Sequence, residues 1–442
     1  DKLNSERFRK LLEAVQELEE VLDNKFLDIE FAMGENLTTY LLQVRKITTQ
    51  TNWNQKVSKS VDLILSGVQS FIKERFKRKI GIYGETTALG QMPDWNPVEM
   101  IGRVPRALAA SLYQVLITDN SWRYARDHMG YAVPTGEPLM VMIAGQPFID
   151  TRLSFHSFLP KDIPPVIAEK LVNHWVNELK NKPEFHDKIE FDIAITCYSF
   201  DFDEKVEKLI GDVLSDEEKL IFKKVHQKHT FELIKGIKQG SIDESLEQIE
   251  ILNEKQKKSS SLYALVDDCI RFGTIPFSIL ARHGFIAKTL LISLKQLNVL
   301  TQNEINQLMG GINTIASELV EDINLLQIEK LSVRDFLNKY GHLRPGTYDI
   351  LSLRYDQMKS LFSGVKKYKL KQEIVQFNLN VSQKQQINKL LKDNNFYDFK
   401  VEDLLEYINK ATVGREYSKF IFFEHWFFAY YCSYWMGRYP CC

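Results

Sequence analysis

The residues best suited to chemistry lie in the segment FLDIEFAMGENLTTYLLQVR, at positions 26 to 45. Two short apolar runs flank a polar Gly-Glu-Asn break that begins at Gly34, which is the pattern of a β-hairpin. Side chains alternate between the two faces of a strand, so Asp28 and Glu30 share one face of the first strand. On the second strand, Gln43 and Arg45 share one face.

These four polar side chains converge if the hairpin loop has an even number of residues. A loop over 35–38 pairs Glu30 with Gln43 and Asp28 with Arg45. Carboxylate and amide oxygens are ligands for a hard cation such as Mg²⁺, and a guanidinium fork binds phosphate. The spacing therefore predicts a magnesium–phosphate site. A surface hairpin with a polar outer face gives the same alternation, and that alternative stays open.

The segments DIEF and LLQVR, followed by Ile47-Thr48, resemble the end of the ATP-grasp nucleotide domain in the pyruvate phosphate dikinase and phosphoenolpyruvate synthase superfamily. The resemblance implies ATP and Mg²⁺ as cofactors. It makes Glu30, Gln43 and Arg45 the cofactor-binding residues, with Glu30 and Gln43 as the metal ligands. The family usually has Arg-Pro-Ile-Thr where this chain has Arg-Lys-Ile-Thr.

Three further segments are similar to the central domain of glutamine kinase-like members of this superfamily. They are PDWNPVEMIG, SLYQVLIT and GQPFIDTRLSFHSFLP, within residues 93–160. The resemblance implies that Arg152, in the strip IDTRLSFHSF, contacts substrate. Taken alone, Asn96 and Pro97 also fit an ordinary helix start, with a side-chain cap followed by proline at the first helical position.

The segment RFGTIPFSILARHGFIAKTLL, at 271–291, places a Gly-Thr-Ile-Pro break between two helical halves. A cation at a broken helix can face a pocket, so Arg271 and Arg282 are candidate substrate-binding residues. Arginines on helices are more often solvated, which is the alternative interpretation.

The segment YGHLRPGTYDILSLRY, at 340–355, is the best candidate for an acceptor site. Arg344 can clamp an anion, and His342 can move a proton at neutral pH. The segment resembles the GHRGPGEYDI-type stretch of rifampicin phosphotransferase-like proteins, which implies catalytic roles for His342, Arg344 and Asp349. Arg354 adds a second, substrate-binding cation. An irregular loop with a satisfied histidine explains the same residues.

The superfamily passes phosphate through a histidine in a Gly-Gly-x-x-(Ser/Thr)-His context, and none of the nine histidines here has that context. The chain begins at Asp1, in a helix that leads directly to the hairpin. We therefore expect a piece of a longer protein. Its expected partners are a small-molecule acceptor and the nucleotide-binding and phosphohistidine domains of the parent protein.

Composition narrows the function classes. The net charge is −1, from 57 basic and 58 acidic residues, which gives no electrostatic footprint for nucleic acid. None of the five cysteines forms a CxxC pair, so the sequence does not support a zinc ribbon. The cysteine pattern is more typical of a protein in a reduced compartment than of a disulfide scaffold. No apolar run reaches the 18 residues of a membrane span. The expectation is a soluble, cytoplasmic protein that binds neither nucleic acid nor membrane.

Apolar residues recur at spacings of three and four over most of the chain, which predicts helices. The runs at 139–144 and 189–199 predict two strands, paired with each other. The fold class is therefore α+β and mainly helical, with a small β component in a large helical central domain. The predicted domains are an ATP-grasp tail at 1–50, a central acceptor-substrate domain at 51–420 and an atypical tail at 421–442.

The end of the chain, FFEHWFFAYYCSYWMGRYPCC, is dense in aromatic residues and cysteine. A reading-frame change or a truncation explains this run better than a buried C-terminal helix. A tail of this kind carries no function and promotes aggregation.

Together these features predict a fragment of an ATP-dependent, dikinase-like phosphotransferase, a kinase that moves phosphate from ATP to histidine and then to a small acceptor. The resemblance implies release of AMP and phosphate, with L-glutamine or pyruvate as the acceptor. The isolated fragment is expected to be inactive. The alternative is a non-catalytic helical binding module or a degenerate remnant.

Overall fold

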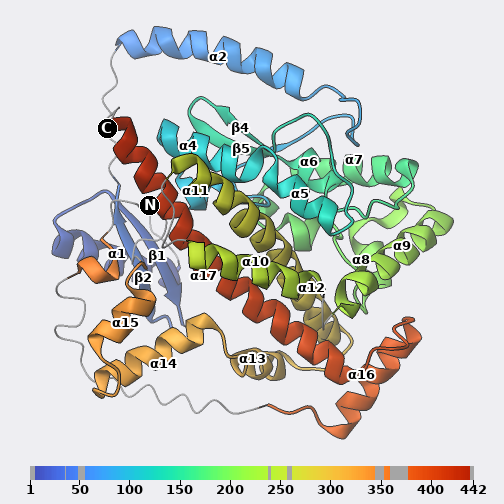
Figure 1. The fold of residues 1–442 in the computed structure, drawn as a ribbon. Helices are drawn as coiled ribbons and strands as arrows, with labels where there is room; N and C mark the ends of the chain where they lie inside the picture. The colour runs from blue at the N-terminus through green and yellow to red at the C-terminus, as the bar shows by residue number, and fades with distance from the viewer. Residues whose placement is uncertain are drawn as a thin grey trace. The chain divides into compact units, whose positions relative to one another are not determined.

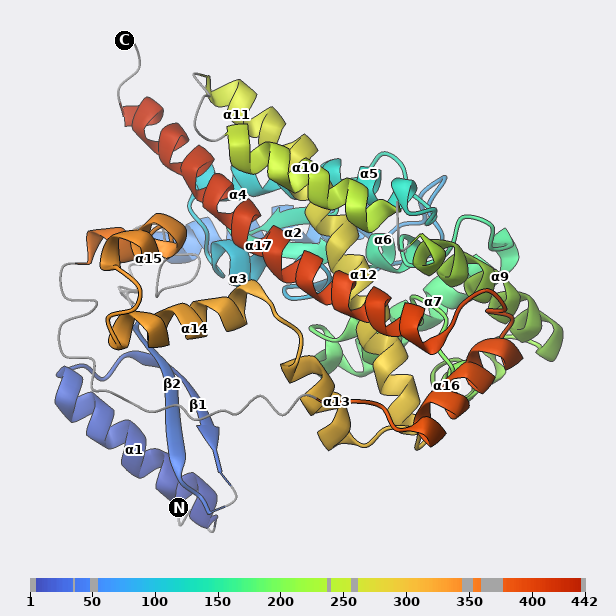
Figure 2. The same ribbon diagram turned by 60° about the horizontal axis from the view of Figure 1, so that its bottom comes forward.

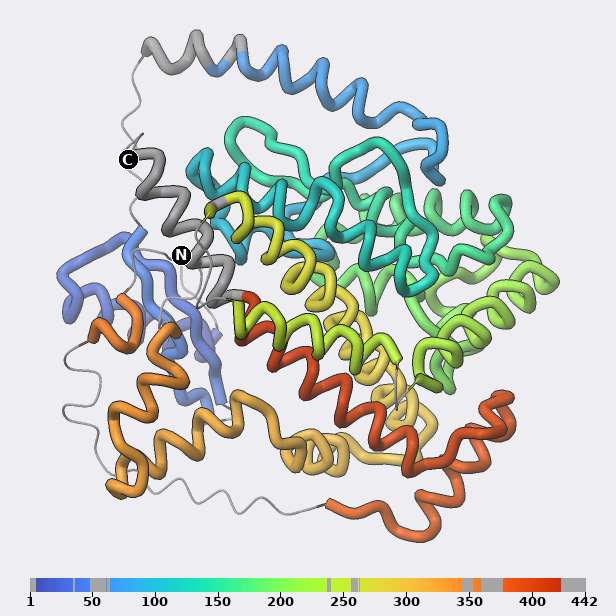
Figure 3. The backbone as a smooth tube through the Cα atoms, viewed as in Figure 1, coloured from blue at the N-terminus to red at the C-terminus, as the bar shows by residue number. Residues whose placement is uncertain are grey.

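The computed structural model describes residues 5–34, 36–47, 55–236, 240–255, 261–343, 353–358 and 377–438. Helix accounts for 64% and strand for 8%, which confirms a mainly helical fold with small sheets. The chain divides into two compact units, Asp1–Gly67 and Val68–Cys442. Figure 3 follows the backbone through both.

The first unit contains a helix followed by an antiparallel hairpin. Helix α1 (Glu6–Leu22) ends at Asp23, whose left-handed conformation (φ 45°) directs its N–H back to the carbonyl of Glu20. Strands β1 (Leu27–Met33) and β2 (Thr39–Lys46) follow. Helix α2 (Gln55–Arg75) then runs from the first unit into the second.

The second unit holds a three-stranded antiparallel sheet in the order β3-β5-β4. Its strands are β3 (Leu89–Gly90), β4 (Met140–Ile143) and β5 (Gln146–Asp150). Strands β4 and β5 are joined by Ala144 and Gly145, which both have positive φ (48° and 81°). Two consecutive positive φ values are what a two-residue type I′ hairpin turn requires. The strand predicted at 139–144 is therefore confirmed.

The strand predicted at 189–199 is wrong. Residues Ile189–Ile193 form a π-helical turn, η3, in which the N–H of Ala194 donates to the carbonyl of Ile189 at 2.8 Å. The buried side chains are Ile189 and Ile193, and a spacing of four fits one helical turn as well as a strand. Short apolar alternation alone does not separate these two structures.

Helices cover the rest of the second unit. In chain order the remaining ones are α3 (Pro97–Ile101), α4 (Ala107–Tyr113), the π turn η1 (Gln114–Thr118), α5 (Ser121–His128), α6 (Thr151–His156), α7 (Pro165–Asn181), η2 (Pro183–Phe185), α8 (Phe202–Leu209), η4 (Gly211–Val213), α9 (Asp216–Lys235), α10 (Ser241–Lys255), α11 (Leu262–Asp268), the π turn η5 (Cys269–Thr274), α12 (Ile275–Gln296), α13 (Gln302–Gly310), α14 (Ile315–Gln327), α15 (Val333–Tyr340), η6 (Tyr355–Gln357), α16 (Val381–Asp393) and α17 (Val401–Arg438).

Helix α12 lies at the centre of the core of the second unit. It packs along α10 and α17, and the three helices lie side by side in both ribbon views (Figures 1 and 2). Its buried side chains include Leu280, Ile286 and Leu290, and they extend over more than one face. A helix that is apolar over most of its circumference is suited to such a position.

The break expected at Gly273-Thr274-Ile275-Pro276 does not occur. Residues Tyr263–Gln296 form one continuous helix, in which η5 supplies a π turn just before Pro276. Local π geometry lets a helix accommodate a proline without ending. Within the described residues this is also the one helix long and apolar enough to cross a membrane, and 61% of its apolar window is buried inside the protein. That burial is typical of a core helix.

The region predicted to be an atypical tail begins inside helix α17. The backbone stays helical to Arg438, and Phe422 is fully buried. The ring of Phe422 stacks on Phe277 of α12, with centroids 5.3 Å apart and an interplanar angle of 11°. The first residues of that region therefore belong to the packed core.

Candidate functional site

The hairpin brings together the polar residues singled out from the sequence. Glu30 pairs with Gln43, and Asp28 pairs with Arg45, as predicted. The loop differs from the expected one, because Gly34 already pairs with Thr38 through a 2.9 Å hydrogen bond. The odd loop is compensated by a β-bulge: Phe31 pairs with Leu41 while Glu30 pairs with Gln43, which leaves the residue between them as the extra one.

Arg45 is the centre of this polar face. Its Nη2 donates to Glu30 Oε1 at 2.7 Å, and its Nε lies 3.4 Å from Asp28 Oδ2. All three side chains are about half exposed, so their charges remain accessible to a ligand. The arrangement places two carboxylates, one amide and one guanidinium on a single accessible surface.

This donor set fits a magnesium-bound phosphate better than a fully protein-coordinated metal. Within the residues that the structure describes, no group of three or more His, Cys, Asp or Glu side chains is arranged to hold a metal ion. Mg²⁺ is commonly bound through one or two carboxylates together with substrate phosphates and water. Glu30 and Gln43 can supply such oxygens, while Arg45 can meet a phosphate.

In the second unit, Arg282 is buried and forms an ion pair. Its Nη2 donates to Glu190 Oε1 at 2.8 Å, which joins α12 to η3. Its guanidinium carbon lies 4.9 Å from the ring centroid of Phe158 and 5.7 Å from that of Tyr131. Nε and Nη1 of Arg282 have no hydrogen-bond partner among the described residues. Arg282 is therefore a core cation with unused donors.

A second buried pair lies next to the first. Arg126 Nη2 donates to Asp94 Oδ1 at 3.2 Å, and Ser154 Oγ donates to Asp94 Oδ2 at 3.2 Å. Arg126 also faces the ring of Phe158, at 5.8 Å, so the two guanidiniums share one aromatic neighbour. Burial, and then the charge of Arg282, lower the pKa of Arg126.

The loop that carries Asp94 contains two left-handed residues. Asp94 and Asn96 both have positive φ (52° and 43°), a conformation that is uncommon outside glycine and that Asp and Asn adopt more readily than other residues. Asn96 caps α3 by accepting from the N–H of Glu99 at 3.3 Å, as expected from the sequence. Residues held in such conformations are concentrated at functional sites, because the surrounding structure must stabilise them.

Arg152 holds neighbouring backbone in place. It is fully buried, and its guanidinium donates to the carbonyls of Lys77 (2.9 Å) and Arg75 (3.1 Å). The nearby Asp150 accepts from Arg75 Nε at 2.7 Å and from Thr87 Oγ1 at 2.6 Å. These bonds fasten the end of α2 to the sheet.

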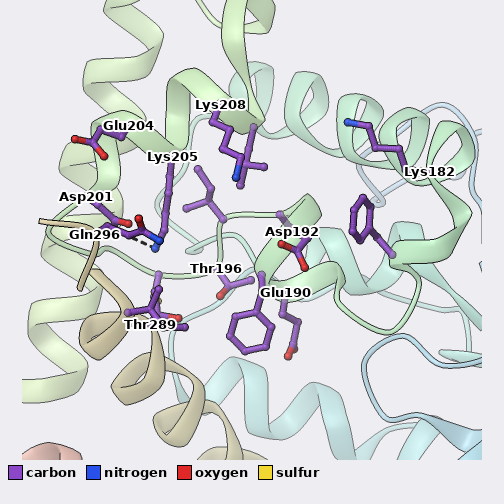
Figure 4. A pocket seen from close by; sticks show the side chains of 17 residues that line it. Lys182, Glu190, Asp192, Thr196, Asp201, Glu204, Lys205, Lys208, Thr289 and Gln296 are labelled. Atoms are coloured by element: carbon purple, nitrogen blue, oxygen red, sulfur yellow. Dashed lines mark ion pairs between the residues drawn. The ribbon is translucent and has the colours of Figure 1, made fainter. Parts of the chain in front are cut away.

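A cavity of about 490 Å³ opens beside Glu190, between α8, η3 and α12 (Figure 4). Thr196 and Cys197 are among the buried residues of its lining, and burial raises the pKa of the Cys197 thiol. Glu190 lines this cavity and also pairs with Arg282, so the cavity adjoins the buried arginine cluster.

The other predicted site residues are dispersed. Arg271 is exposed and pairs with Asp267 at 2.9 Å, and it lines a separate surface pocket of about 560 Å³. Arg354 pairs with Asp356 at 2.6 Å. His342 packs edge-on against the ring of Phe420, with centroids 4.6 Å apart. The other two catalytic candidates, at positions 344 and 349, lie outside the described residues.

Sequence reasoning missed Arg126, Glu190 and the cavity residues of α8. The sequence does mark Asp94 and Asn96, through the Pro-Asp-Trp-Asn-Pro run, as a constrained turn. Nothing local marks Glu190, because the arginine that it meets lies 92 positions further along the chain.

Comparisons with known proteins give no independent assignment. No family model matches the sequence, and neither a curated protein nor a solved structure matches it. The functional argument therefore depends on the residues themselves and on the arrangement described above.

Proposed function

We propose that this chain is part of an ATP-dependent phosphotransferase of the dikinase type, in which the hairpin of the first unit contacts Mg²⁺ and the phosphates of ATP. The observation that carries the proposal is the pairing of Glu30 with Gln43 and of Asp28 with Arg45. This pairing lines up the groups that a magnesium–phosphate complex requires.

The chemical contribution of these residues is positioning and charge neutralisation. Glu30 and Gln43 present oxygens to Mg²⁺, and Arg45 balances the negative charge of the phosphates. In the scheme implied by the sequence resemblance, ATP phosphorylates a histidine and, with uptake of one water molecule, releases AMP and phosphate. The phosphohistidine, which belongs to another module, then phosphorylates a small acceptor such as L-glutamine or pyruvate in the cytoplasm.

The acceptor is proposed to lie near His342, Arg344 and Asp349. In the longer protein, exchanging Arg344 for Ala should raise the KM for the acceptor or lower kcat. Unchanged values of both would remove this arginine from the acceptor site.

The nucleotide step is tested by measuring binding of ATP to the longer parent protein, which supplies the rest of the nucleotide-binding domain, by isothermal titration calorimetry with and without Mg²⁺. We expect magnesium-dependent binding that weakens at least about tenfold in Glu30→Gln, because a charged metal ligand is lost. Glu20→Gln on α1 removes the same charge away from the hairpin face and should bind as the wild type does. Equal binding by both variants would contradict the proposal.

An AMP-formation assay separates the proposal from the alternative of a non-catalytic helical module. The chain alone should release no AMP from ATP in the presence of glutamine or pyruvate, whereas a longer parent protein should. Absence of AMP from both would favour the binding module.

A further inference from the structure

The cavity between α8, η3 and α12 has the size and walls of a small-molecule site. Its volume of about 490 Å³ lies within the range of roughly 300–1,000 Å³ that is usual for ligand pockets. Elements η2, η3, α8 and α12 all contribute to its lining, so its shape depends on the tertiary packing of the second unit. Phe185 and Phe191 supply apolar surface, while Thr196 and Thr289 supply hydroxyl groups.

Several of the charged residues that line this cavity are already paired. Lys205 contacts Asp201 at 3.0 Å, and Lys182 contacts Glu178 at 2.6 Å. Glu190 is engaged by the buried Arg282. These pairs neutralise one another and leave little attraction for a ligand of a single charge.

The remaining charged lining residues are Lys208, Asp192 and Glu204, whose side chains form no ion pair or hydrogen bond with any described residue. Lys208 enters from α8, and Asp192 lies across from it on η3, whereas the carboxylate of Glu204 points away from both (Figure 4). Among the described lining residues, the cavity therefore presents one free cation and one free anion from different walls. Apolar and hydroxyl-bearing side chains supply much of the rest of the lining.

We infer that this cavity binds a small molecule with an amine at one end and a carboxylate or phosphate at the other, separated by a short apolar chain. The ammonium of the ligand meets Asp192, and its anionic group meets Lys208. An α-amino acid carries both charges on one carbon, whereas Asp192 and Lys208 belong to different walls of the cavity. The inference is independent of the proposed phosphotransfer, since it uses neither the hairpin nor the segment at 340–355.

The test is calorimetric titration of the full chain with 5-aminovalerate and with 3-aminopropyl phosphate. We expect saturable one-to-one binding of at least one of them. Norvaline, an isomer of 5-aminovalerate with adjacent charges, should bind at least about tenfold more weakly. Valerate and pentylamine each keep only one of the two charges. They should also bind at least about tenfold more weakly, because one charge-assisted hydrogen bond is lost.

Substitutions then locate the site. Asp192→Asn and Lys208→Gln should each weaken binding about tenfold. Glu204→Gln is the matched control, because Glu204 lies on the same helix as Lys208 and near the same cavity, but its carboxylate points away (Figure 4). It should change affinity less than about twofold, a change worth well under the 1.4 kcal/mol of a tenfold effect.

Three results would overturn the inference. They are no binding of either two-ended probe, equal binding of norvaline, and equal affinity of Asp192→Asn, Lys208→Gln and the wild type. Loss of ATP binding in the hairpin variant would leave this test unaffected, so the two proposals can fail separately.

Discussion

Arg282 and Glu190 connect the central helix α12 to the π turn η3 through one hydrogen bond of 2.8 Å between Nη2 and Oε1. The two side chains are only 1% and 10% exposed, so the pair is largely screened from solvent. Burial raises the pKa of Glu190, and the positive charge of Arg282 counteracts part of that rise. The pair therefore holds a cavity wall against the core.

Replacing one member of this pair should be more harmful than replacing both. Arg282→Met leaves a buried carboxylate without its partner, which typically costs about 3–5 kcal/mol of unfolding free energy. The double variant Arg282→Met/Glu190→Met should recover most of that loss. Urea denaturation of the single and double variants measures the coupling.

The control for this cycle is Arg271→Met, which removes a cation from the exposed pair with Asp267. Its effect should stay within about 0.5 kcal/mol. A single Arg282 variant as stable as the wild type would show that the buried pair adds nothing to stability.

Acid should destabilise the second unit through His156. Its Nδ1 accepts the N–H of Tyr83 at 3.1 Å, and burial lowers the pKa of His156 to about 4 from an ordinary value of 6.5. The unfolded chain binds the proton more tightly between these two values, so stability falls as the pH drops from 6.5 towards 4. By pH 5 the loss from this residue should reach about 2 kcal/mol.

Denaturant titrations at pH 7 and pH 5 check this expectation. His156→Asn keeps an acceptor for the Tyr83 N–H but cannot be protonated, so its stability should fall less than that of the wild type over this interval. His128→Asn, at an exposed position, should follow the wild type. An identical pH dependence for the wild type and His156→Asn would contradict the prediction. The pKa of the buried His283 is also lowered by burial, to about 3, and this histidine adds to the slope in all three proteins.

Gly273 should not tolerate a side chain. A Cβ at this position of η5 would lie 2.8 Å from Cδ2 of Phe422, whose ring is itself stacked on Phe277. Gly273→Ala should therefore cost about 1–3 kcal/mol, because the packed ring has no space to move into. Thermal or urea denaturation measures the cost.

Gly310→Ala is the matched substitution for Gly273→Ala. Gly310 lies at the end of α13, and no described atom comes within 4 Å of the place that an added methyl group would take. Alanine should therefore be neutral there or stabilising by up to about 1 kcal/mol. Equal effects at the two positions would show that helix propensity, and not the contact with Phe422, decides the outcome.

Replacing Arg152 should lower the unfolding free energy of the protein, whether or not a ligand is present. Arg152→Met leaves the carbonyls of Lys77 and Arg75 without their donors, at a cost of about 3 kcal/mol. Arg103→Met, at an exposed position, should change stability by less than about 0.5 kcal/mol. If Arg152→Met unfolds at the wild-type urea concentration and only weakens ligand binding, then Arg152 is a substrate contact, as the sequence resemblance implies.

The hairpin shows which structural features the local sequence pattern predicts correctly and which it does not. Alternation along β1 and β2 predicted which side chains share a face, because the period of a strand is set by backbone geometry. The loop length was wrong, since turn geometry depends on backbone angles that composition specifies weakly. The correct pairing survived only because a bulge restored the offset.

The interior of the second unit was much less predictable. The segment at 189–199 has the alternation of a strand, yet packing favours a π turn with Ile189 and Ile193 inward. The neighbouring ion pairs join Asp94 with Arg126 and Glu190 with Arg282, residues that are far apart in the chain. Such contacts follow from the tertiary arrangement and leave no spacing in the sequence to detect.

Because of the bulge at Leu42, a change in the length of the turn and a change in the length of the second strand can compensate each other. With one more residue in the turn, the two strands would already pair next to the turn in the register that they have beyond the bulge. The extra residue at position 42 would then no longer be needed to restore that register. Relatives of this chain with a turn longer by one residue should therefore be shorter by one residue in the second strand. Paired insertions and deletions of this kind would preserve the polar face while the tip varies freely.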